Sequence, residues 1–275
     1  MKLAIAILLA FVLATPVQGY STHVSRGHGE REVLIGVPES SPTSLLVMLH
    51  GFLSNGQAIF NKMTRVSSVE ALEYLDEKRM LTAAPTGNLD QKGFTHWKAT
   101  KGCCGTLLAS EQNYTEDPQY VRDLATSLLS EYPSISRESV FVLGFSNGGF
   151  LAQRVACLHS DLFSAIVSMA GMQVHATADA PNVCAPTHPA SALLIHGVED
   201  KVIPYGGGST VWAPFPSSEA SVEQWAEAKG CPVPVPDAPY ARINLLTKDE
   251  DLETEKLMLT ECGSGDGSLR PLVCS

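Results

Sequence analysis

The chain has 275 residues, 44% of them hydrophobic, so it is long enough to bury the core of one large domain. It carries 29 acidic and 19 basic residues, which gives a formal net charge of −10 at pH 7. An acidic surface of this size repels nucleic acids and anionic membranes, so we expect neither as a partner.

Residues 1–19 have the pattern of a secretory signal peptide. Lys2 precedes an apolar run of 12 residues, Leu3–Ala14, which is too short to cross a bilayer comfortably, and small or compact residues stand before Tyr20. We expect removal of this segment to leave one secreted, extracellular domain over residues 20–275, with 18 basic and 29 acidic residues and a net charge of −11. The alternative interpretation of the segment is a short membrane anchor.

All seven cysteines follow the predicted cleavage site, and secretion permits them to form disulfides. Their spacing does not fit the C-x-x-C pattern of zinc sites, so we expect no metal. An odd count leaves one thiol without a partner inside the chain. The cysteines are Cys103, Cys104, Cys157, Cys184, Cys231, Cys262 and Cys274.

Apolar runs that are typical of buried strands alternate along the chain with helical patterns. Such alternation predicts a parallel α/β sheet with helices on both faces. The last predicted helix has Ser221 as its N-cap and Gly230 as its stop. We expect strands at residues 44–51, 80–87, 139–144, 163–171 and 191–197, helices at 69–78, 116–132, 149–159 and 221–230, and late strands at 256–260 and 268–273.

Residues 205–218 form the longest irregular stretch and contain two large aromatic residues, Trp212 and Phe215. These side chains either line a substrate cleft or pack an ordinary loop, and the sequence favours neither interpretation.

The segment GFSNGG, residues 144–149, fits G-x-S-x-G, the turn that presents a nucleophilic serine. It follows a strand pattern and opens a helical pattern at Phe150, which is the strand–turn–helix context that such an elbow requires. Glycines on both sides of the serine let strand and helix approach without a Cβ clash. We therefore predict Ser146 as the nucleophile and the backbone N–H of Asn147, at the helix N-terminus, as an oxyanion donor.

Two further parts of the site follow from the order of the strands. The loop after the strand at 44–51 contains His50, Gly51 and Phe52, so the backbone N–H of Phe52 is the candidate for the second oxyanion donor. We interpret His50 as a turn residue rather than a base. Asp200, just beyond the strand at 191–197, is the candidate for the acid that orients the base, and Glu199 is the alternative. The non-catalytic interpretation of both is a solvated loop carboxylate.

These residues resemble the secreted α/β-hydrolase family that includes polyhydroxybutyrate depolymerases and feruloyl esterases. Segments in the family's order span most of residues 20–275, and GFSNGG and HGVEDKVIPY are the most specific of them. The resemblance implies the α/β-hydrolase fold, hydrolysis of carboxylic esters without a metal or organic cofactor, Ser146 as nucleophile and Asp200 as triad acid. It also implies one disulfide, which maps onto Cys231 and Cys262.

The base of this triad is missing from its expected place. The family order is Ser, Asp, His along the chain, but no histidine follows Asp200, and the late cysteine Cys262 is followed by GSGDGSLRPLVCS instead of a Gly-His turn. Three explanations are open: a sequence that is incomplete or misread at its end, a poor or inactive enzyme that still binds ligand, and an earlier histidine, His175 or His188, that substitutes as base. His196 is a weaker candidate, because the family also builds that turn with His-Gly.

The sequence thus predicts a serine esterase, and the resemblance implies as substrates feruloyl or acetyl esters of plant cell-wall polysaccharide, or a polyhydroxyalkanoate polyester. The alternatives are a catalytically impaired or truncated homologue that binds such a ligand and, with less support, a serine peptidase.

The protein collected from culture medium should have its N-terminus near Tyr20, because signal peptidase cleaves after small residues that follow an apolar run. N-terminal sequencing measures this directly. A cytosolic protein that retains Met1 would contradict the signal-peptide assignment.

Overall fold

The computed structural model describes residues 20–28, 31–65, 68–100, 103–104, 116–172, 186–188, 190–209, 214–228, 241–243, 254–259 and 272–274. Several predicted features lie outside this part of the chain, namely the signal segment at residues 1–19, the disulfide partners Cys231 and Cys262, and the residues His175, Trp212 and Gly230.

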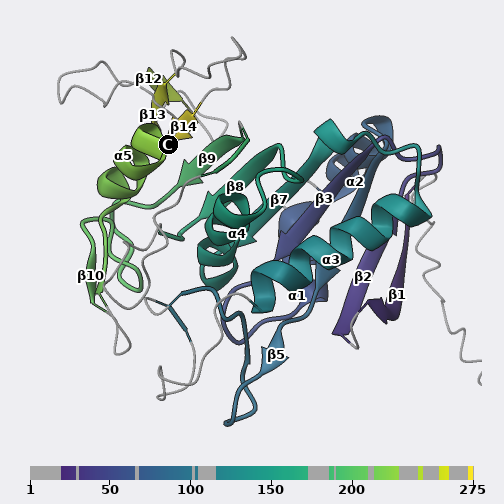
Figure 1. Cartoon of the computed structure of the whole chain (residues 1–275), viewed down its shortest axis with the longest axis horizontal. Coiled ribbons are helices and arrows are strands. Elements are labelled where there is room, and N and C mark those ends of the chain that lie inside the picture. The colour runs from purple at the N-terminus through teal and green to yellow at the C-terminus, as the bar shows by residue number, and fades with distance from the viewer. Residues whose placement is uncertain are drawn as a thin grey trace, which may run out of the picture.

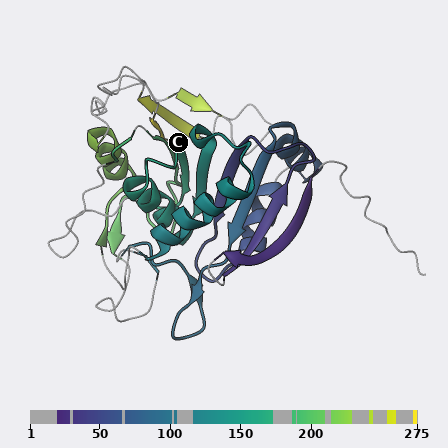
Figure 2. The ribbon, with the colours of Figure 1, turned by 45° about the vertical axis from the view of Figure 1, so that its right-hand side comes forward.

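A ten-stranded sheet forms the centre of the molecule, in the order β1-β2-β4-β3-β7-β8-β9-β14-β13-β12. Neighbouring strands from β4 to β14 run parallel, and antiparallel pairs extend the sheet on both sides. The sheet twists from the purple strands β1 and β2 to the yellow strands at the other side (Figure 2). The strands are β1 Ser21–His28, β2 Arg31–Val37, β3 Ser44–Leu49, β4 Met80–Pro85, β7 Val140–Phe145, β8 Ala165–Met169, β9 Ser191–Ile195, β12 Ala241–Ile243, β13 Thr254–Leu259 and β14 Leu272–Cys274.

Helices cover both faces of this sheet (Figure 1), which confirms the predicted architecture. The alternation of side chains in β3 shows how: Val47 packs with the residues of α3, α4 and α5, whereas Met48 packs with those of α1 and α2. Among the described helices, none is long and apolar enough to cross a membrane. The helices are α1 Gly56–Arg65, α2 Ser68–Glu77, α3 Glu116–Glu131, α4 Asn147–Leu158 and α5 Ser218–Ala228.

The structure differs from the sequence prediction at the start of helix α5 and in the irregular stretch before it. Helix α5 begins at Ser218, so Ser221 is not its N-cap but lies buried in the helix, and Ser217 Oγ instead accepts the N–H of Ala220 at 3.1 Å. The irregular stretch at 205–218 contains a short hairpin of β10 Gly208–Ser209 and β11 Pro214–Phe215. Phe215 is buried in the main core, so it packs the fold rather than lining a cleft.

Strands β1, β2 and β12 and helix α1 were not predicted. Strand β1 is largely polar and exposed, so it lacks the apolar pattern by which strands are found in a sequence. A second small hairpin pairs β5 Asn88–Leu89 with β6 Thr95–His96. Cys103 and Cys104 follow this hairpin and form a disulfide with each other. The sequence analysis predicted no partner for either cysteine.

A buried ion pair fixes the start of α3 against β2. Arg31 Nη2 lies 2.6 Å from Asp117 Oδ1, and only 8% and 1% of the two side chains are exposed. The other oxygen of Asp117 accepts the backbone N–H of Lys98, and the Arg31 guanidinium lies 4.0 Å from the centre of the Tyr120 ring. Because the surroundings are poorly solvated, loss of one partner would leave an uncompensated charge in the core.

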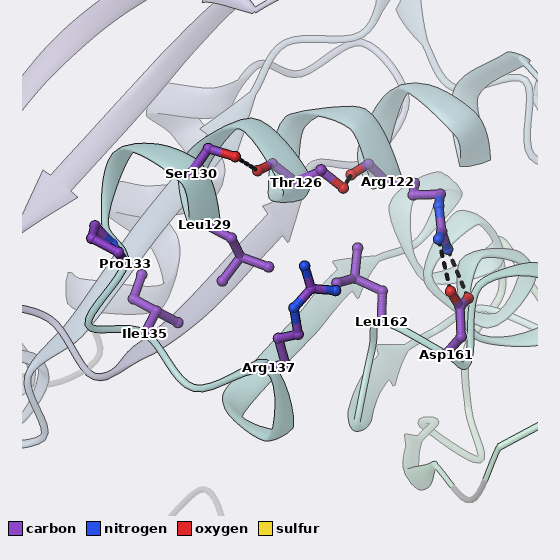
Figure 3. Close-up of a pocket in the computed structure, with 9 residues that line it drawn as sticks. All are labelled: Arg122, Thr126, Leu129, Ser130, Pro133, Ile135, Arg137, Asp161 and Leu162. Carbon is purple, nitrogen blue, oxygen red and sulfur yellow. Dashed lines mark hydrogen bonds and ion pairs between the residues drawn. The ribbon is translucent and has the colours of Figure 1, made fainter.

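We expect Asp117→Ala to lower the free energy of unfolding by about 3–5 kcal/mol, because it leaves the buried Arg31 guanidinium without a counter-ion. The matched control is Asp161→Ala, which removes the two-point ion pair with Arg122 seen in Figure 3. That pair is 30% and 39% exposed, so its loss should cost at most about 1 kcal/mol. Equal losses in urea denaturation would contradict the assignment of the Arg31 pair as a core element.

Candidate active site

Ser146 lies in a sharp turn between the end of β7 and the start of α4. Its φ and ψ are 53° and −118°, a combination that non-glycine residues rarely adopt. Leu53 and Ala170, which follow β3 and β8 at the same edge of the sheet, also have positive φ values of 62° and 52°. Backbone strain of this kind persists only where surrounding contacts enforce it, and it concentrates at functional sites.

Two glycines allow this turn to be so tight. A Cβ on Gly144 would overlap the carbonyl oxygen of Gly148, and a Cβ on Gly148 would overlap that of Leu49 in β3. The first turn of α4 therefore packs directly on the backbones of β7 and β3, as the motif predicted.

The backbone of Ser146 is firmly held while its side chain is available. Its N–H donates to the carbonyl of Met169 at 2.8 Å, and its carbonyl accepts the N–H of Phe150 at 3.0 Å. Within the described residues, no hydrogen bond reaches Ser146 Oγ. The side chain is half-buried, so the hydroxyl can meet a ligand at the carboxyl edge of the parallel strands, where α/β proteins bind ligands.

The loop after β3 lies against this elbow. A Cβ built on Gly51 would stand 3.4 Å from Ser146 Cβ, so the residue before Phe52 lies beside the predicted nucleophile. The Phe52 ring meets the Phe94 ring edge-on, with 6.0 Å between their centres. The next residue, Leu53, donates its N–H to the carbonyl of Thr95 at 3.0 Å, which ties the loop to β6.

His50 is a buried, neutral residue that orients this loop. Its Nε2 accepts the N–H of Gly87 at 2.9 Å, so the proton is on Nδ1, which donates to the carbonyl of Gly51 at 2.7 Å. Burial lowers the pKa of His50 to about 4. Since C=O and N–H point in opposite directions in a trans peptide, this bond directs the N–H of Phe52 away from the imidazole. His50 is thus a turn residue, as predicted, and both of its nitrogens are occupied.

Asp200 follows β9 at the same edge of the sheet as Ser146. Its Oδ1 accepts the backbone N–H groups of Val202 and Ile203 at 2.8 and 2.9 Å. Its Oδ2 lies 3.7 Å from Nε2 of His196, which itself donates to the carbonyl of Ile203 at 2.7 Å. Glu199 is exposed and makes no polar contact with any described residue, so Asp200 is the better-positioned carboxylate of the two.

The structure removes one of the substitute bases considered above. The N–H of His188 donates to Ser160 Oγ at 3.1 Å, and Ser160 lies just beyond the C-terminal end of α4. That helix has 12 residues and is about 18 Å long, with Ser146 at its other end. His188 therefore lies at the wrong edge of the sheet.

A cavity of about 290 Å³ also lies at that far edge (Figure 3). It is bounded by the second half of α3, by the segment that leads into β7, and by the turn after α4, where Arg122 pairs with Asp161. Because these elements meet where β7 begins, the cavity is separate from the elbow at the end of β7.

The model of the Phospholipase/Carboxylesterase family matches residues 31–219, which include Phe52, Ser146 and Asp200. The chain belongs to this family. The resemblance inferred from the sequence is thereby confirmed at the level of this family, and the narrower group of polyhydroxybutyrate depolymerases and feruloyl esterases stays a prediction.

Two curated relatives are named as esterases. One is a protein of Nocardia uniformis subsp. tsuyamanensis named as the esterase NocK, to which the chain is 34% identical over 104 residues. This match covers 37% of this chain and 29% of that protein. The other is a protein of Aspergillus flavus named as feruloyl esterase C, to which the chain is 25% identical over 206 residues. That match covers 73% of this chain and 66% of the relative. The chain thus spans less than two thirds of the length of either relative.

The α/β-hydrolase fold of the family is confirmed by a solved structure. Acetyl xylan esterase from Aspergillus awamori superposes with a TM-score of 0.60, covering 93% of this chain and 92% of that one, at 14% sequence identity. A likeness at this identity concerns the fold.

Sequence reasoning missed Trp97, which is fully buried between the elbow and the loop after β3. Its backbone bonds to the side chain of Asn147, and its indole N–H bonds to the carbonyl of His50. Trp97 lies in the segment HWKATKGCCG, residues 96–105. A tryptophan close to two adjacent cysteines was the one signal in it.

We expect His50 to destabilise the fold in mild acid. The folded state holds it neutral with a pKa of about 4, against about 6.5 when unfolded, so the unfolded chain binds more protons between these values. The contribution is complete above about pH 6.5 and is lost as the pH falls towards 4, by up to about 3 kcal/mol.

Urea denaturation of the wild type and of His50→Asn between pH 7 and 4 measures this effect. The variant keeps a donor near the Nδ1 position but cannot be protonated in this range. The difference between the two curves isolates His50 from His159, whose pKa burial also lowers. Parallel curves would refute the neutral assignment.

Proposed function

We propose that the protein is a secreted serine esterase in which Ser146 is the nucleophile. The observation that carries this proposal is the strained Ser146 turn at the carboxyl edge of the sheet, with a hydroxyl that no described residue binds and with the loop of Gly51 against it. A purely structural turn would have no need to hold a serine at φ 53°. The signal-peptide pattern of residues 1–19 supports secretion.

The reaction follows from these positions. Ser146 Oγ attacks the ester carbonyl carbon and gives its proton to a base, and the N–H groups of Phe52 and Asn147 stabilise the oxyanion. The tetrahedral intermediate collapses, the leaving alcohol takes the proton, and the acyl group stays on Ser146. Water then attacks the acyl-enzyme, releasing the acid and restoring the hydroxyl. Asp200 orients the imidazole that carries the proton.

We infer that this imidazole lies outside the described residues. Among those residues, His196 alone has a nitrogen within 4 Å of the Asp200 carboxylate. Its Nε2 is bound to Ile203, and its Nδ1 is buried without a partner, so neither nitrogen is placed to serve Ser146. Of the two substitute bases proposed from the sequence, His188 lies at the wrong edge of the sheet, and His175 lies outside the described residues and stays a candidate.

Feruloyl or acetyl esters of plant cell-wall polysaccharide are the proposed substrates, with a polyhydroxyalkanoate polyester as the second candidate. The relative from Aspergillus flavus is named as a feruloyl esterase, and the protein of like fold from Aspergillus awamori is an acetyl xylan esterase. Among the described residues no imidazole is placed to take the Ser146 proton, which favours one other function, a ligand-binding homologue with little turnover.

Hydrolysis of p-nitrophenyl acetate by this chain tests the nucleophile. We expect slow turnover, and Ser146→Ala should lower it to the level, on the order of 10³–10⁴ over water, that the oxyanion donors and substrate binding alone supply in a serine protease without its triad. Free imidazole should raise the Ser146-dependent rate if no histidine of this chain reaches the serine. If His175 is the base, His175→Ala will abolish turnover and imidazole will restore part of it. A turnover rate in Ser146→Ala that equals the wild-type rate would overturn the proposal.

A further inference from the structure

The side chain of Asn147 is completely buried, and both ends of its carboxamide bind the backbone of one distant residue. Oδ1 accepts the N–H of Trp97 at 2.7 Å, and Nδ2 donates to the carbonyl of Trp97 at 3.1 Å. A polar residue in the first helical turn commonly bonds to its own helix, but these partners are 50 positions away. The carboxamide therefore joins α4 to the segment that contains Trp97.

Trp97 passes this connection on to the loop after β3. Its indole N–H donates to the carbonyl of His50 at 2.9 Å, and the two rings are 4.9 Å apart. His50 in turn donates to the carbonyl of Gly51, the peptide whose N–H belongs to Phe52. A continuous series of hydrogen bonds thus runs from Asn147 to the Gly51–Phe52 peptide.

We propose that the Asn147 carboxamide is a positioning residue that sets the distance between the two oxyanion donors. This inference rests on the proposed function, in which those donors are the N–H groups of Asn147 and Phe52. The donors come from different elements, the start of α4 and the loop after β3. An oxyanion needs both within about 2.7–3.1 Å, and an error of about 1 Å can cost 10²-fold in rate. The connection through Trp97 holds the two elements at one separation.

Two features show why an amide is needed at position 147. A carboxylate would accept the N–H of Trp97 but would leave the carbonyl of Trp97 without a donor. The disulfide of Cys103 and Cys104 lies behind the amide, with Cys103 Sγ 3.9 Å from Asn147 Nδ2, and both cysteines are buried. The carboxamide is therefore enclosed in one orientation.

The chain offers a matched control on the same helix. Gln153 is also completely buried, and its amide donates to the carbonyl of Gly171 at 2.7 Å and accepts the indole N–H of Trp225 at 2.9 Å. Gln153→Ala thus removes a comparable buried amide that has no bond to the loop after β3.

The test compares Asn147→Ala, Asn147→Asp and Gln153→Ala in hydrolysis of p-nitrophenyl acetate. All three keep the backbone N–H of residue 147, so any loss reports on its position. We expect both Asn147 variants to lower kcat about 10–100-fold with little change in KM, and Gln153→Ala to keep kcat within about threefold. Asn147→Asp should recover part of its kcat at low pH, because a protonated carboxyl can again donate to Trp97.

A second measurement keeps the inference testable if turnover is too slow. Hydrogen–deuterium exchange of residues 50–54 should be at least about tenfold faster in Asn147→Ala than in the wild type or Gln153→Ala, because the loop loses its connection to α4. Unchanged exchange, or an equal loss of kcat in the Asn147 and Gln153 variants, would overturn the inference. If Ser146→Ala retains the wild-type rate, the proposed function fails instead.

Discussion

The direct contact of three backbones at the elbow is the constraint on which the rest of the structure depends. Gly148, in the first turn of α4, lies on the carbonyl of Leu49 in β3 and beside Gly144 in β7, with no side chain between them. This contact brings the helix N-terminus, the strained Ser146 and the loop after β3 to one point. A larger residue at either glycine would move α4 off the sheet, and it would separate these parts while every polar side chain of the site remained present.

Behind the elbow, three buried side chains have their polar groups hydrogen-bonded inside the protein. Asn147 and His50 use both polar ends of their side chains, and the indole N–H of Trp97 is also bonded. The ion pair of Arg31 and Asp117 lies one layer further back and binds the backbone of Lys98, next to Trp97. The rear wall of the site is thus held by hydrogen bonds of fixed geometry rather than by apolar packing alone, which suits a site that must place donors accurately.

Local features of the sequence predicted the sheet, its covering helices and the elbow, because a buried strand that runs into glycines and a helix leaves its pattern within about 20 residues. The same local pattern misplaced the start of α5, where Ser217 rather than Ser221 caps the helix. The bonds between Asn147 and Trp97 were beyond such reasoning, since they join residues 50 positions apart and no periodicity marks them. Contacts between residues far apart in the sequence were therefore missed, as was strand β1, which lacks an apolar pattern.

The position of β14 has a consequence for synthesis of the chain. β14 pairs in parallel with β9, and β13 and β12 continue the sheet beyond it. Until residue 272 leaves the ribosome, β9 is an open edge with unpaired backbone groups beside the turn that carries Asp200. Open edges of this kind invite pairing with other chains, so β14 protects the edge of β9 from such pairing once it is in place.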